Sequence, residues 1–219
     1  MTSRTRFLIA SAFITTSTAG LAACGANENE EAVAATPPAV VETPAAGVSC
    51  PTRGALVSPT MPQAVAPPAG AQLFLRVYAE GTQKYTCQMG TTGTVAWTFT
   101  APEAKLYDDR CVLVGSHFAG PTWKIEKDGS AVVGKKTGEA PSPTSGSIPW
   151  LLLTTNTTSG TGTLTPVSYV NRIDTVGGVA PTEGCDAAGI GKKIDVPYSA
   201  TYLFYRNTAE SKTAPTYPY

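Results

Sequence analysis

His117 is the only histidine of the 219-residue chain, and it lies in the segment 115–134 beside Trp123 and two turn signals. A histidine with a pKa near 6.5 exchanges protons at neutral pH, so His117 is a candidate general base. A hydrolase would need a nucleophile and an orienting carboxylate beside it. Nearby residues of suitable chemistry are Ser116, Thr122, Ser130, Asp108 and Asp109. No Gly-x-Ser-x-Gly motif accompanies them, and a lone histidine beside a turn is more often structural.

Four residues are candidates for ligand binding: Trp123, His117, Arg172 and Trp150. Exposed aromatic rings on a β domain stack against sugar rings, whereas buried rings fill the core. Trp123 lies between Pro121 and a charged hairpin, so we expect it to be the most exposed tryptophan. Trp97 lies on an alternating apolar face, so we expect it to be the least exposed. Arg172 either clamps an anion or pairs with Asp174, and the internal pair is the expected arrangement.

Glu126 and Asp128 are two residues apart, as an acid/base pair at the end of a strand would be. Glycosidase carboxylates lie ~5–9.5 Å apart, and one has a raised pKa. Nothing in the sequence predicts such a pKa, so we expect both to be solvated charges of a hairpin. The glycines of 160–162 and 177–178 lack the strand-to-helix context of a phosphate loop, so they predict turns.

The net charge is zero, with 16 basic and 16 acidic residues. Arg4 and Arg6 precede the linker and four acids lie in it, so residues 50–219 carry 14 basic and 12 acidic residues. This balance lacks the basic footprint of a nucleic-acid binder. One histidine, and cysteines without Cys-x-x-Cys spacing, favour no metal site. We expect no metal, no cofactor and no nucleic-acid partner.

Residues 1–23 are typical of a secretory signal, because two arginines precede a mostly apolar run that is too short to span a membrane. The run ends in Leu21-Ala22-Ala23-Cys24, which resembles the lipobox of bacterial lipoproteins. We therefore expect export and anchoring to a lipid membrane through acylated Cys24. Plain cleavage after Ala23 is the alternative. Because Gly25 follows Cys24, we expect the outer membrane in a two-membrane host, and otherwise the outer face of the cell membrane.

Residues 24–49 form a linker without an aromatic residue. Such a segment buries too little apolar surface to offset its ordering entropy, so we expect a disordered tether. Residues 50–219 are expected to form one domain, which begins with a proline-rich loop over 50–70.

Alternating apolar and polar residues predict short strands, and no long helical period is present. The expected strands are 73–78, 82–88, 95–99, 105–107, 111–114, 123–127, 130–135, 148–153, 167–173 and 194–204. Gly81 is expected to turn the first strand into the second, and Pro102 to end the third. Asp128 and Gly129 predict a tight hairpin, and 137–147 predicts a loop. The fold class is therefore all-β, a single antiparallel β-sandwich or barrel-like domain.

Four cysteines remain beside Cys24, namely Cys50, Cys87, Cys111 and Cys185. An even number in an exported protein predicts two disulfides. Four cysteines allow three pairings, and the sequence does not separate them.

Several segments in order resemble the DUF3455 family, a domain of unknown function in exported bacterial and fungal proteins. These segments are 81–87 (GTQKYTC), 101–104 (APEA), His117 with 120–123 (GPTW), 128–130 (DGS), 148–153 (IPWLLL), 177–178 (GG) and 198–205. The resemblance covers about 67–206, and Phe118 stands where a tyrosine or a small residue is common. It implies the disulfide Cys87–Cys185 and leaves Cys50–Cys111. It implies no catalytic residue, because the family has no established activity.

The anchor, the tether and the lack of a complete catalytic set favour a ligand- or partner-binding module of the cell envelope. The alternative is a hydrolase that acts on cell-wall or extracellular carbohydrate through His117. The sequence does not predict the ligand or the oligomeric state.

Overall fold

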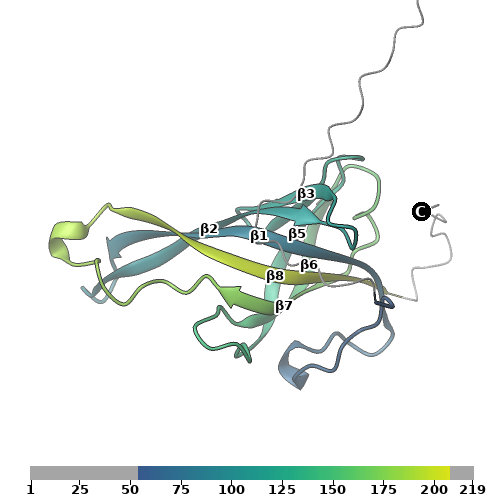
Figure 1. Ribbon diagram of the computed structural model, residues 1–219, viewed down its shortest axis with the longest axis horizontal. Coiled ribbons are helices and arrows are strands. Elements are labelled where there is room, and N and C mark those ends of the chain that lie inside the picture. Colours follow the sequence, from purple (N-terminus) through teal and green to yellow (C-terminus); the bar gives the residue numbers. More distant parts are fainter. Residues whose placement is uncertain (1–53, 208–219) are drawn as a thin grey trace, which may run out of the picture. The chain divides into compact units, whose positions relative to one another are not determined.

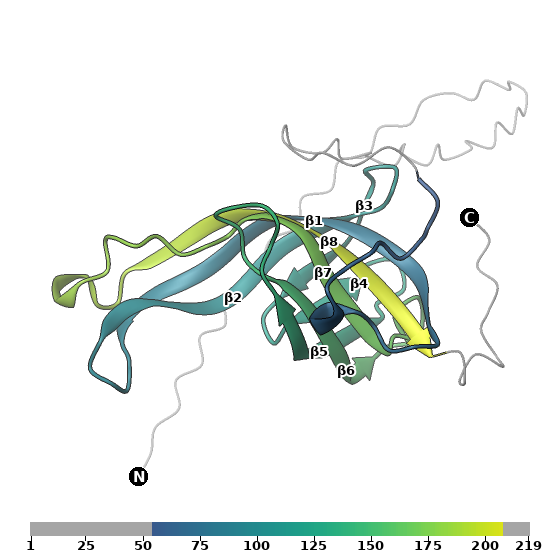
Figure 2. The ribbon, with the colours of Figure 1, turned by 90° about the horizontal axis from the view of Figure 1, so that it is seen from below.

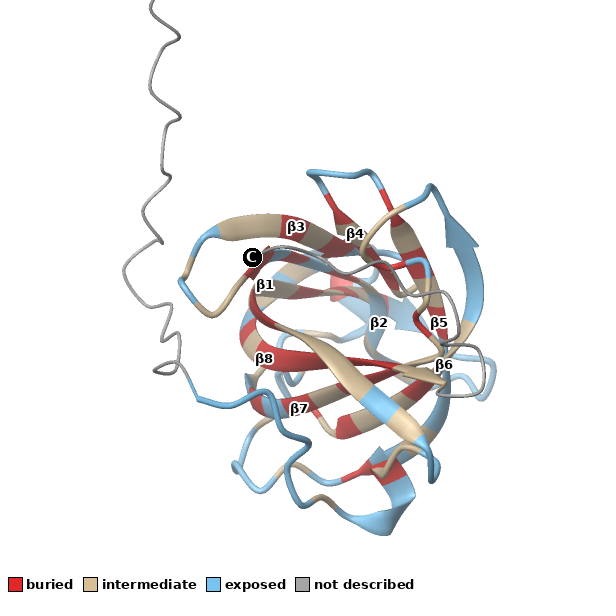
Figure 3. Ribbon diagram, turned by 90° about the vertical axis from the view of Figure 1, so that its right-hand side faces the viewer, coloured by how far each residue is buried: buried red, intermediate tan, exposed pale blue. Residues whose placement is uncertain are grey.

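The computed structural model describes residues 54–207, which form eight antiparallel strands closed into a barrel. Each strand pairs with the next along the chain, and β8 pairs with β1 (Figure 3). The elements are η1 Gln63–Val65, β1 Ala71–Met89, β2 Val95–Tyr107, β3 Leu113–Phe118, β4 Thr122–Ile125, β5 Ala131–Ala140, β6 Trp150–Ser159, β7 Tyr169–Gly177, η2 Ala187–Gly189 and β8 Lys193–Asn207. The predicted all-β class is confirmed, and its form is a barrel. None of the helices within 54–207 has the length and apolar character that crossing a membrane requires.

Side-chain alternation along the strands separates an interior core from an outer cluster. Every second residue of β8 from Tyr198 to Phe204 belongs to the interior core, together with Val77 of β1 and Trp123 of β4. This confirms the alternating face expected for 194–204, because successive side chains of a strand point to opposite faces. Buried residues recur in this way on the strands of the barrel (Figure 3).

The segment before β1 covers part of the outer face of the barrel. Val65 of η1 is fully buried in a second cluster that contains Trp150, Ile173 and Leu203. The Asn171 amide nitrogen donates to the Val65 carbonyl oxygen at 2.8 Å. The proline-rich loop expected before the first strand therefore packs on the domain.

Strands β1, β2 and β8 continue past the barrel as a three-stranded ribbon (Figures 1 and 2). Neighbouring strands do not follow them, since β3 pairs with β2 only from Ala104 and β7 pairs with β8 only from Tyr198.

The Cys87–Cys185 disulfide ties β1 of the ribbon to the loop before η2, which confirms that pairing. Cys111 is also disulfide-bonded, but Cys50, its predicted partner, lies outside the described residues. Cys24 and the linker lie there too.

Two strand boundaries expected from the sequence are wrong. Gly81 does not turn the chain but lies within β1, where a Cβ atom would collide with the Glu103 carbonyl oxygen of β2. Because Gly81 has no side chain, the backbones of β1 and β2 can lie close together at this position. Pro102 does not end a strand but lies within β2. Strand β3 does not reach it, so β2 is an edge strand at Pro102, the kind of position where a strand tolerates a proline.

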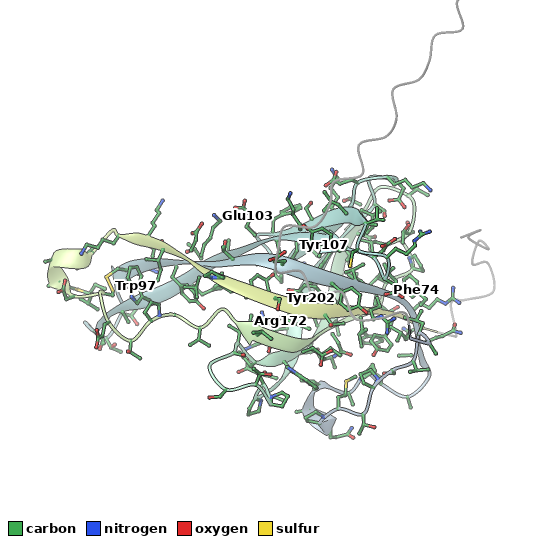
Figure 4. All side chains as sticks on the ribbon, viewed as in Figure 1. Phe74, Trp97, Glu103, Tyr107, Arg172 and Tyr202 are labelled. Atoms are coloured by element: carbon green, nitrogen blue, oxygen red, sulfur yellow. A yellow bond between two sulfur atoms is a disulfide. The ribbon has the colours of Figure 1, made fainter. Side chains whose placement is uncertain are left out.

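The ribbon also reverses the expected exposure of two tryptophans. Trp97 lies on the ribbon (Figure 4) and is partly exposed, whereas Trp123 is only 1% exposed. The Trp97 indole N–H donates to the Glu183 carbonyl oxygen at 2.9 Å. Alternation identified an apolar face at Trp97, but that face lies beyond the barrel and has less structure to cover it. The loop expected at 137–147 starts late as well, because β5 continues to Ala140.

Asp128 holds the turn between β4 and β5 to the loop between β6 and β7. Its Oδ1 accepts from Ser130 N at 2.9 Å and Ser130 Oγ at 2.6 Å. Its Oδ2 accepts from Thr163 N at 2.7 Å and Thr163 Oγ1 at 2.6 Å. Burial acts to raise the pKa of Asp128, but these hydrogen bonds outweigh it and lower the pKa to about 2. The hairpin at Gly129 is confirmed, and Asp128 is exposed on it as expected, but the sequence did not predict the hydrogen bonds of its carboxylate.

Replacing Asp128 with Ala is expected to lower the free energy of unfolding by about 1–3 kcal/mol, because donors of Ser130 and Thr163 lose a charged acceptor. The lowered pKa of Asp128 also makes stability depend on pH. The stabilisation is complete above the ordinary pKa of 3.8 and is lost as the pH falls towards about 2. Chemical denaturation measures both effects.

Glu126→Ala is the matched control, because the carboxylate of Glu126 is exposed and meets only Ser116 and Lys124. We expect it to change stability by about 0.5 kcal/mol or less. Equal losses in the two variants would contradict the role given to Asp128.

Candidate functional site

His117 and Trp123 meet because of the register of the β3–β4 hairpin. They are direct cross-strand partners, and Gly120 supplies the positive φ, 90°, of the turn between them. Their rings stack with centroids 4.6 Å apart and planes 14° apart. On the neighbouring strand, a side chain at Gly134 would crowd Trp123 Cζ3. The glycine therefore leaves room for the indole ring inside the barrel.

His117 is a neutral, buried histidine. Burial lowers its pKa from 6.5 to about 3, against the opposing effect of a hydrogen bond to the Thr122 backbone. That bond joins Nδ1 to the Thr122 carbonyl oxygen at 2.8 Å. A carbonyl oxygen only accepts, so Nδ1 carries the proton and Nε2 carries the lone pair. A histidine in this state is not the general base of pKa near 6.5 that the sequence made a candidate.

Barrel closure adds Tyr202 of β8 and Arg172 of β7 to the stacked pair. The Tyr202 ring lies 5.0 Å from His117 and 5.2 Å from Trp123, centroid to centroid. Burial raises the pKa of Tyr202, and the positive charge of Arg172 partly opposes that rise. Arg172 and Tyr202 are direct cross-strand partners on β7 and β8, and Figure 4 labels both residues.

These four side chains line one cavity of about 140 Å³. The lining also includes Phe99, Thr100, Pro102, Gly120, Pro121, Lys136, Leu151 and Leu153. An engineered apolar cavity of ~150 Å³ accommodates benzene. The space thus suits a ligand of about one ring, and its lining is mostly apolar with few polar groups.

Trp123 carries an unusual polar group for such a position. Its indole N–H is buried and has no hydrogen-bond partner among residues 54–207. Leaving a buried donor unpaired costs ~1–3 kcal/mol, so native structures rarely keep one without a reason. An acceptor on a ligand or a bound water would remove this cost.

The structure does not assemble the hydrolytic set considered from the sequence. Ser130 and Thr122 direct their hydroxyls to Asp128 and to the Ala119 carbonyl oxygen, and Ser116 donates to Glu126. Asp109 pairs with Arg76, and Asp108 with Arg110. Neither carboxylate therefore orients His117, whose ring is held by a backbone carbonyl. No group of three His, Cys, Asp or Glu side chains within 54–207 is arranged to hold a metal ion.

The other ligand-binding candidates divide between the cavity and the outer face. Trp150 lies in the outer cluster beneath η1, so it is not brought together with His117, Trp123 and Arg172. The expected Arg172–Asp174 pair is absent from the ion pairs of residues 54–207. A bulge after Ile173 and a φ of 50° at Asp174 break the alternation that would have placed both on one face.

Sequence reasoning did not identify Tyr202, Phe99, Leu151 or Leu153 as site residues. Phe99 and Tyr202 lay on alternating strand patterns, and Leu151 and Leu153 in a continuous apolar run. Such patterns predict strands but not which of their residues border a cavity. Their meeting with His117 depends on pairings between strands that are far apart in the sequence.

The comparisons with known proteins give one family. The family model for DUF3455, described as a protein of unknown function, matches residues 68–113 and 111–206. No curated protein and no solved structure matches the chain.

The protonation state of His117 generates a pH prediction. The folded-state pKa, about 3, lies below the ordinary 6.5, so between these values the unfolded chain binds a proton that the folded chain does not. The contribution of His117 to stability is therefore complete above pH 6.5 and decreases as the pH is lowered. Between pH 6.5 and pH 4.5, His117 alone is expected to remove about 2–3 kcal/mol.

His117→Gln is expected to lack that part of the pH dependence in chemical denaturation. NMR titration of the imidazole in the wild-type chain is the direct check, and a midpoint above pH 5.5 would contradict the buried neutral state.

Proposed function

Since this chain belongs to the DUF3455 family, whose function is unknown, we propose from the site itself that the barrel binds a small, one-ring ligand. The observation that carries the proposal is the cavity that His117, Trp123, Arg172 and Tyr202 share. Eight-stranded barrels are just wide enough to be filled by side chains or to hold one small ligand. The mouth of a barrel is also a common place for ligand pockets.

The strength of such binding is bounded by ligand size. At roughly 0.6 kcal/mol per heavy atom, a neutral ligand of about eight heavy atoms has a Kd on the order of 0.3 mM. The cavity geometry favours binding over hydrolysis, because His117 is neutral, buried and held by a backbone carbonyl. Binding is therefore measured with simple one-ring probes at millimolar concentration.

Benzyl alcohol is expected to bind the full chain and to shift the NMR signal of the Trp123 indole N–H. Leu151→Trp is expected to weaken this binding at least about tenfold, because Leu151 lines the cavity and an indole at that position would occupy the space. Calorimetric titration gives the affinities. Absence of any shift at millimolar probe would overturn the proposal.

Two exposed phenylalanines provide a matched pair of variants. Phe99, 50% exposed, borders the cavity, whereas Phe118, 40% exposed, does not. Phe99→Ala is expected to weaken binding by roughly three- to tenfold, as removal of apolar contact area predicts, and Phe118→Ala to leave it unchanged. Equal effects would place the probe elsewhere on the protein.

The proposed setting of this module is the cell envelope, with the chain anchored through acylated Cys24. The support is the sequence Leu21-Ala22-Ala23-Cys24 after an apolar run. Several acyl chains on one residue give stable anchoring, where a single chain holds only marginally. The Cys87–Cys185 disulfide is compatible with an oxidising compartment.

Cys24→Ser is expected to shift the protein from the membrane fraction to the soluble fraction. The intact mass of the wild-type protein is expected to show removal of residues 1–23 and added acyl chains, and that of the variant to lack the acyl chains. A membrane-bound variant, or a wild-type mass without lipid, would contradict the anchor.

A further inference from the structure

Arg172 is the feature of the cavity that the binding of a neutral ring leaves unexplained. Resting on the proposed function, we propose that the natural ligand is a small aromatic carboxylate, whose carboxylate pairs with Arg172 and whose ring lies against Trp123. The inference depends on the hydrogen bonding and charge of Arg172, on the surrounding rings and on the cavity size.

The protein partners of Arg172 carry no negative charge. Its Nε and Nη2 donate to the Pro149 carbonyl oxygen at 3.1 and 2.9 Å. That bond uses two of the five N–H donors of the guanidinium group and fixes its position. Tyr202, the other neighbour, has a pKa raised by burial and remains a neutral hydroxyl. The guanidinium group is thus held in place, with donors remaining for a ligand.

Several surface cations of the barrel have a carboxylate partner. Lys124 and Lys136 each pair with a glutamate on their own hairpin, at 2.8 and 2.6 Å, and Arg76 makes a bidentate contact to Asp109. Within residues 54–207 no carboxylate lies within ion-pair distance of the half-buried Arg172. A cation withdrawn from water without a countercharge is costly, and an anionic ligand would relieve that cost.

The surroundings select the form of the anion. A planar carboxylate matches the planar fork of a guanidinium group. The remaining space, about 140 Å³, is walled by Trp123, Tyr202 and Leu153, so the body of the ligand is apolar and about one ring in size. Sugars and nucleotides fit poorly, because their many polar groups would lack partners on this wall. The unpaired Trp123 indole N–H adds one donor for an acceptor group.

The test compares benzoate with benzamide, which has the same planar shape without the charge. Both are titrated into the full chain at neutral pH and low salt. Benzoate is expected to bind about 10- to 100-fold more tightly, the range typical of hydrogen bonds to a charged group. Arg172→Gln is expected to abolish this preference and to change benzamide affinity less than about threefold, whereas Arg172→Lys keeps part of it.

Lys135→Met is the matched control, because Lys135 is exposed on the same strand and does not line the cavity; the preference for benzoate is expected to survive it. Equal binding of benzoate and benzamide by the wild-type chain overturns this inference and leaves the proposed function standing. If neither these probes nor benzyl alcohol binds, the proposed function fails as well. Should Arg172→Gln fail to fold, the wild-type ratio and Arg172→Lys decide the matter.

Discussion

The pairing of β1 with β8 is the constraint on which the rest of this structure depends. It joins Ala71 to Asn207 and continues to Thr86 and Lys193, so the two ends of the domain share one ladder of hydrogen bonds. Closure converts eight half-buried strands into one interior. It also places Tyr202 of the last strand against the His117–Trp123 pair of the β3–β4 hairpin. Without that pairing the site residues would share no common space.

Whether a barrel of this size holds a ligand depends on a few side-chain volumes. Leu164, from the loop that Asp128 holds, fills part of the interior and is fully buried. Gly134 removes a side chain where Trp123 needs room. The result is an interior that is well packed around Leu164 and Phe204 and open where His117 and Arg172 lie. The loop that Asp128 holds and the proposed binding cavity are thus parts of the same packed interior.

The low polarity of the interior also favours the neutral forms of the titratable side chains that lie in it. Burial keeps His117 neutral and raises the pKa values of Tyr198 and Tyr202. Arg172 is the cationic side chain that lies beside these groups in the cavity lining. In the proposed binding, recognition depends on Arg172 among neutral rings, because Lys136, the other cation of the lining, is paired with Glu139. In that proposal the wall provides shape and apolar contact, and the arginine provides the preference for one sign of charge.

The sequence by itself determined the all-β class, the Gly129 hairpin and the inward face of the last strand, because turn chemistry and alternation act over a few neighbouring residues. Together with the family resemblance, it also led to the Cys87–Cys185 pair. It placed His117, Trp123 and Arg172 among the candidates by residue type alone. Only the tertiary structure decided that these three meet while Trp150 faces outward, and that Gly81 and Pro102 lie within long strands. It also decided that Arg172 has no carboxylate partner within residues 54–207. Those outcomes depend on pairing between distant strands and on one bulge, and neither leaves a local pattern in the chain.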